Sequence, residues 1–61
     1  MTLMNRLRAV AKVQRRDQGR RFVLRAGGAT FEYFPKTGEW VRRGSGRSRR
    51  GLRGLIREIT G

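Results

Sequence analysis

Residues 20–34 of the chain read RRFVLRAGGATFEYF, and this stretch decides the fold. Two segments, 20–26 and 29–34, are rich in aromatic and β-branched residues, a composition typical of strands. Between them stand Gly27 and Gly28, which readily adopt the positive φ angles of a two-residue hairpin turn. The stretch therefore predicts an antiparallel β-hairpin.

The turn also fixes which side chains share a face of the hairpin. If Ala26 lies opposite Ala29, four large apolar side chains fall on one face: Phe22, Leu24, Phe31 and Tyr33. The other face is mainly polar: Arg21, Val23, Arg25, Thr30, Glu32 and Phe34. We expect the aromatic face to form part of the hydrophobic core, rather than to serve as a stacking platform for the bases of single-stranded nucleic acid.

Downstream of the hairpin, residues 35–38 read PKTG, a second turn. The segment 39–43 then predicts a third strand. In the expected register Trp40 lies beside Tyr33 on the aromatic face, and Arg43 joins the polar face.

Upstream, residues 3–16 show an apolar spacing typical of an amphipathic helix, with Thr2 as N-cap and Gly19 beyond its end. The apolar side chains are Leu3, Leu7, Val10 and Ala11. The opposite side of this helix would carry a secondary basic face: Arg8, Lys12, Arg15 and Arg16.

At the other end, residues 44–51 predict a flexible basic loop, and residues 49–60 predict a short helix that Ser48 could cap. Its apolar stripe is formed by Leu52, Leu55, Ile56 and Ile59, beside a stripe of Arg49, Arg53 and Arg57. The predicted fold is a single α+β domain spanning residues 1–61. In it, a helix, a three-stranded antiparallel meander and a second helix follow in order (α-β-β-β-α), with both helices on the aromatic face.

Charge is the strongest functional signal in the sequence. Sixteen Lys and Arg residues stand against four acids, which gives a formal net charge of +12. Such an excess repels itself in the folded state unless a polyanion neutralises it. Arginine, the commoner cation here, offers a planar fork that matches phosphate oxygens and the edges of guanine bases.

The residue inventory argues against several function classes. The chain has no Cys and no His, so disulfides, Cys/His zinc sites and haem ligation are excluded. General acid–base catalysis usually relies on His or on paired carboxylates, and the acids are scattered. We therefore expect no enzyme activity, no cofactor and no metal. We find neither a membrane span nor a signal peptide, so a cytoplasmic protein is expected.

Two groups of arginines are the primary candidates for nucleic-acid binding. The first lies on the polar sheet face with Thr30 and Phe34: Arg21, Arg25 and Arg43. The second spans the loop and the start of the last helix, where it could form a phosphate clamp: Arg47, Arg49, Arg50 and Arg53. The alternatives are a solvated sheet face with cross-strand Arg–Glu pairs and a disordered basic linker.

Residues 31–59 also resemble a known group of proteins. They contain the run FEYFPKTGEW, a Gly/Arg loop and the run RGLRGLI. This arrangement resembles small tailed-bacteriophage proteins that share an aromatic-x-Pro-x-Thr-Gly-x-Trp hairpin, a basic glycine loop and a short helix. The resemblance implies a phage origin and hence a bacterial host cytoplasm. The order of elements is also similar to integrase arm-type and methyl-CpG-binding domains, which read DNA through a three-stranded sheet.

We expect a nucleic-acid-binding protein, with DNA favoured over RNA, that holds its partner mainly by phosphate contacts. The alternative is a small phage-type effector that binds and inhibits an acidic host protein of the transcription or defence machinery, because carboxylate patches attract the same basic surface. The sequence is compatible with a monomer or a homodimer.

Overall fold

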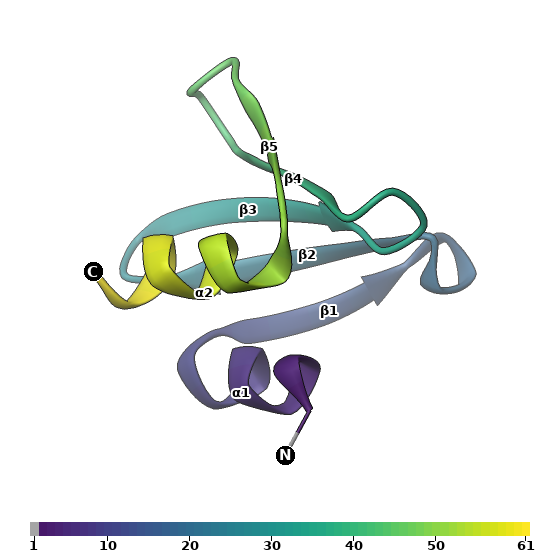
Figure 1. The fold of residues 1–61 in the computed structure, drawn as a ribbon, viewed down its shortest axis with the longest axis horizontal. Coiled ribbons are helices and arrows are strands. Elements are labelled where there is room, and N and C mark those ends of the chain that lie inside the picture. Colours follow the sequence, from purple (N-terminus) through teal and green to yellow (C-terminus); the bar gives the residue numbers. More distant parts are fainter. Residues whose placement is uncertain (1) are drawn as a thin grey trace.

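A five-stranded antiparallel sheet with two helices on one face forms the scaffold of the protein (Figure 1). The computed structural model describes residues 2–61, apart from the side chains of Leu3 and Met4. The elements in chain order are α1 (Leu3–Val10), β1 (Lys12–Arg16), the 3-10 turn η1 (Asp17–Gly19), β2 (Arg21–Ala26), β3 (Ala29–Phe34), β4 (Glu39–Arg42), β5 (Ser48–Arg50) and α2 (Leu52–Thr60). The predicted α+β class, with a helix at each end of an antiparallel meander, is confirmed, but the meander has five strands instead of three.

The central hairpin of β2 and β3 has the predicted register. Ala26 pairs with Ala29 and Leu24 pairs with Phe31. Gly27 and Gly28 adopt φ angles of 57° and 80°, as the two-residue turn requires. The next pairing is also as predicted, because Tyr33 of β3 lies opposite Trp40 of β4.

The predicted helix over residues 3–16 is wrong in its second half. Thr2 caps the helix by accepting a hydrogen bond from the Asn5 N–H at 3.1 Å, but α1 ends at Val10. Ala11 is extended, with φ −148° and ψ 155°, and β1 then pairs along β2 with Val13 opposite Leu24. This pairing satisfies backbone groups along the edge of β2 that would otherwise face solvent.

The side chains around this transition follow the strand pattern. Leu7 is fully buried, whereas Val10 is 38% exposed and does not belong to the core. The predicted packing of Leu3 concerns a side chain outside the described residues. Ala11 and Val13 both pack against the core, because alternate residues of a strand share one face.

The predicted loop 44–51 and the predicted helix start at 49 are also corrected. Ser48–Arg50 form β5, which pairs with β4, so Ser48 is not an N-cap. The N-cap is Gly51, whose φ of 100° lets the chain turn directly from strand into helix. β5 covers the outer edge of β4 and thereby encloses Trp40.

The core lies between the helices and the aromatic sheet face, as predicted. Its buried members are Leu7, Leu24, Phe31, Tyr33, Trp40 and Leu55, with Leu52, Ile56 and Ile59 packed against them. The rings of Phe31 and Trp40 meet edge to face, with centroids 6.2 Å apart. The Trp40 Nε1–H donates a hydrogen bond to the Gly51 carbonyl at 3.0 Å, which ties β4 to the start of α2.

Candidate nucleic-acid interface

The sheet face opposite the helices, called here the open face, carries the first predicted group. The register places Arg21, Arg25, Thr30, Glu32 and Phe34 on this face. Their shared orientation was predicted, but several of the charged side chains on this face already form ion pairs with one another.

Glu32 neutralises two of the three predicted arginines. One carboxylate oxygen lies 3.4 Å from Arg21 Nη1 and the other lies 3.4 Å from Arg43 Nη2. Arg21 also contacts Asp17 at 3.4 Å. The cross-strand Arg–Glu pairs that were the alternative for this face are therefore present. These side chains would have to exchange a carboxylate for a phosphate in order to bind nucleic acid.

Arg25 differs, because no acid within residues 2–61 forms an ion pair with it. It lies directly opposite Lys12 of β1, and together with Gln14 and Val23 they line a hollow of about 120 Å³. Like charges placed directly opposite each other destabilise a sheet.

The second predicted group is divided by the strand that sequence reasoning missed. Arg49 and Arg50 are neighbours in β5, so their side chains project from opposite faces. Arg50 reaches Glu39 on the open face at 3.3 Å. Arg49 lies on the helical side with its guanidinium carbon 6.0 Å from the centre of the Trp40 ring. The predicted clamp of Arg47, Arg49, Arg50 and Arg53 is thus not one site.

The β4–β5 hairpin nevertheless gathers its own cations. It extends beyond the rest of the sheet (Figure 1). Ser45 closes its turn, donating hydrogen bonds from its backbone N–H at 3.0 Å and its hydroxyl at 2.9 Å to the Arg42 carbonyl. A hollow of about 120 Å³ beside it is lined by Trp40, Arg42, Ser45, Arg47, Arg49 and Glu58. Arg42 lies over Phe31, with its guanidinium carbon 6.0 Å from the ring centre.

The predicted secondary basic face of the first helix does not exist as one surface. Arg8 belongs to α1, whereas the other three residues belong to β1. Lys12 and Arg16 fall on the open face, and Arg15 falls on the helical side, where its Nη2 donates to the Gln18 carbonyl at 3.1 Å.

Comparison with known proteins gives no family: no family model matches the chain, and no curated protein or solved structure matches it significantly. Within residues 2–61 no group of three or more His, Cys, Asp or Glu could hold a metal ion. No helix in the same range is long and apolar enough to cross a membrane.

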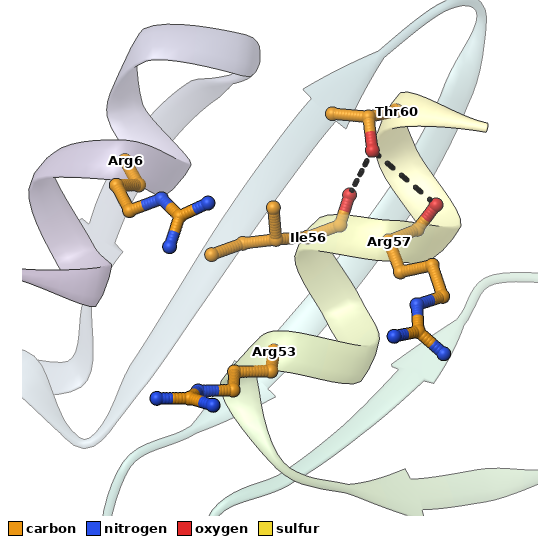
Figure 2. Close-up of a pocket in the computed structure, with 5 residues that line it drawn as sticks. All are labelled: Arg6, Arg53, Ile56, Arg57 and Thr60. Carbon is orange, nitrogen blue, oxygen red and sulfur yellow. Dashed lines mark hydrogen bonds between the residues drawn. The ribbon is translucent and has the colours of Figure 1, made fainter.

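A third cationic site, between the two helices, was not predicted. Arg6 of α1 and Arg53, Ile56, Arg57 and Thr60 of α2 line a cleft of about 430 Å³, called here the inter-helix cleft. Figure 2 shows Arg6 extending from α1 toward α2, and Arg53 and Ile56 extending toward α1. The spacing of Arg53 and Arg57 was visible in the sequence, but no local pattern connects them to Arg6.

Proposed function

We propose that the protein binds nucleic acid, with duplex DNA as the preferred partner, mainly through contacts between its arginines and phosphates. The observation that carries this proposal is the projecting β4–β5 hairpin, with Arg42, Arg47 and Arg49 around one hollow. A two-stranded ribbon is narrow enough to enter the major groove of B-DNA. Arginines along such a ribbon can contact phosphates at the groove walls and guanine edges on its floor.

The aromatic contacts support this role for the hairpin. Arg42 and Arg49 each lie over a buried ring, Phe31 and Trp40 respectively. A guanidinium held against a ring loses less conformational entropy on binding than a freely rotating side chain. The net charge of +12 supports the same conclusion, because a phosphate backbone would neutralise the repulsion within the folded chain. The proposal includes a bacteriophage origin, and hence a bacterial host cytoplasm, on the basis of the resemblance of residues 31–59 to phage proteins.

The test is fluorescence anisotropy of labelled duplex DNA, single-stranded DNA and structured RNA, titrated at several salt concentrations. We expect the tightest binding to duplex DNA. The logarithm of its affinity should fall with the logarithm of salt concentration, with a slope of about −0.9 per phosphate contact. Sub-micromolar affinity near 0.15 M salt, roughly the physiological ionic strength, would support the proposal.

A matched pair of variants separates the hairpin from charge alone. Arg47→Gln/Arg49→Gln removes two cations from the hairpin, and Arg20→Gln/Lys36→Gln removes two exposed cations from the turns at the other end of the sheet. We expect the hairpin variant to lose on the order of tenfold in affinity or more, and the control much less. Equal losses, or binding to all three polymers that vanishes near 0.2 M salt, would refute a specific nucleic-acid site. A discrete, nuclease-resistant complex with an acidic protein would then favour the effector role.

A further inference from the structure

The four ion pairs among the described residues are distributed unevenly over the molecule. They join Arg21 to Asp17 and Glu32, Arg43 to Glu32, and Arg50 to Glu39. Glu32 and Glu39 lie on the open face and Asp17 follows β1, so these carboxylates reduce the positive charge on that side. The remaining acid, Glu58, belongs to α2.

Glu58 is not among the residues that line the inter-helix cleft. It lines the hollow beside the β4–β5 hairpin, on the flank of α2 that carries Gly54. Gly54 itself faces Trp40, since a Cβ atom built there would lie 3.8 Å from the indole ring. Arg53, Arg57 and Thr60 instead line the inter-helix cleft.

Three arginines and no acidic residue therefore line the inter-helix cleft. Arg6, Arg53 and Arg57 are all exposed, and no ion pair within residues 2–61 involves them. Bringing like charges together between packed helices opposes that packing. The Thr60 hydroxyl donates a hydrogen bond to the Ile56 carbonyl at 2.9 Å, so the arginines are the strong donors at the cleft. Figure 2 shows the Arg6 and Arg53 side chains extending into the space between the helices, whereas the Arg57 guanidinium extends away from α1.

Guanidinium groups arranged in this way suit a phosphate. Each can donate two parallel hydrogen bonds to phosphate oxygens, and such charge-assisted bonds are stronger than neutral ones. The Ile56 side chain forms an apolar part of the wall, which reduces local solvation of the charges. A carboxylate would fit the same donors, but a phosphodiester backbone can occupy two cationic sites with one continuous ligand.

We infer that the inter-helix cleft holds a backbone phosphate of the same nucleic acid that the β4–β5 hairpin contacts. The binding surface then lies across the helical side of the protein, with α2 between the two cationic sites, and the open face turns to solvent. This inference rests on the proposed function and names the surface that performs it.

Two variants of equal charge test the inference. Arg6→Gln/Arg53→Gln removes one cation from each helix of the cleft, and Lys12→Gln/Arg25→Gln removes the facing cations of the open face. With duplex DNA we expect the cleft variant to lose on the order of tenfold in affinity and to flatten the salt slope by about 1, because the phosphate contact in the cleft is lost. The open-face variant should lose less than about threefold, because salt screens charges that do not contact the DNA. Thermal unfolding of both variants verifies that each is folded.

An equal loss in both variants, or a larger loss in the open-face variant, would overturn the inference while leaving the proposed function intact. Arginine side-chain NMR supplies an independent measurement. A short DNA duplex should shift the Nε–Hε signals of Arg6 and Arg53 in the wild type, and pyrophosphate alone should shift the same signals at higher concentration. If pyrophosphate saturates the cleft but no nucleic acid binds, both the inferred occupant and the proposed function are wrong. If duplex DNA binds without shifting these signals, only the cleft assignment is wrong.

Discussion

Trp40→Phe is the most informative single change to the fold. Trp40 is 3% exposed and its Nε1–H donates to the Gly51 carbonyl at 3.0 Å, so the replacement removes a hydrogen bond worth about 1 kcal/mol. The smaller ring also leaves a void beside Phe31 and Gly54, which costs roughly another 1 kcal/mol at about 24 cal/mol per Å³ of cavity. A chain of this length has a total stability of only about 3–9 kcal/mol. A loss of about 2 kcal/mol should therefore lower the Tm by roughly 8–16 °C.

Thermal unfolding followed by far-UV circular dichroism at fixed salt measures this loss. Tyr33→Phe is the matched control, because it keeps the buried ring and removes only a hydroxyl. We expect the control to change the Tm by only a few degrees. If Trp40→Phe shifted the Tm no more than the control, the bond from β4 to the start of α2 would not contribute to stability, and our account of how β5 and α2 are anchored would be refuted.

Three further predictions concern stability, and all are measured by thermal or urea unfolding. Gly28→Ala should lower the free energy of unfolding by about 1 kcal/mol, because φ at Gly28 is 80°. Gly54→Ala should raise it by up to about 1 kcal/mol, because Ala is the better helix former and its methyl group would make ordinary contact with Trp40. If Gly28→Ala were the more stable of the two variants, the turn and helix assignments would be contradicted. Glu32→Gln should destabilise the protein by about 1 kcal/mol, because Arg21 and a second arginine lose a shared carboxylate; an unchanged Tm would show that the open-face pairs are merely solvated. The Tm should rise as salt is increased from about 0.01 to 0.15 M, because screening weakens the repulsion within a chain of charge +12; a falling Tm would mean that ion pairs outweigh repulsion.

The central hairpin could be predicted from sequence because its information is local. Alternating apolar residues and the Gly27-Gly28 turn fix both strand type and register, and one further turn places Trp40 beside Tyr33. The N-terminal helix could not be bounded, because Ala11 fits the helical repeat of Leu3, Leu7 and Val10 and also the strand repeat that continues at Val13. Pairing with β2, a tertiary contact, decided between them.

Strand β5 was missed for a different reason. Ser48–Arg50 contains no apolar residue and has little strand preference of its own. Its conformation follows from backbone pairing with β4. That pairing also separates the side chains of Arg49 and Arg50 onto opposite faces and so divides the predicted clamp.

For the candidate sites, sequence reasoning located the cations of the open face and offered cross-strand Arg–Glu pairs as an alternative, but it did not identify the two arginines that pair with Glu32. The Glu32 pairs depend on the distances between side chains of β2, β3 and the turn that follows β4. Arg6 and Arg53 are far apart in the sequence and meet only because both helices dock on the same face of the sheet.

The order of the strands in the sheet is also their order along the chain, and this has a consequence for how the protein folds. Each strand pairs with the one that precedes it through a short connection, so closing each pairing costs little chain entropy. Proteins dominated by such local pairings fold quickly. The contact between α1 and α2 joins the two ends of the chain. The sheet can therefore assemble hairpin by hairpin, while completion of the core waits for the first and last segments to meet.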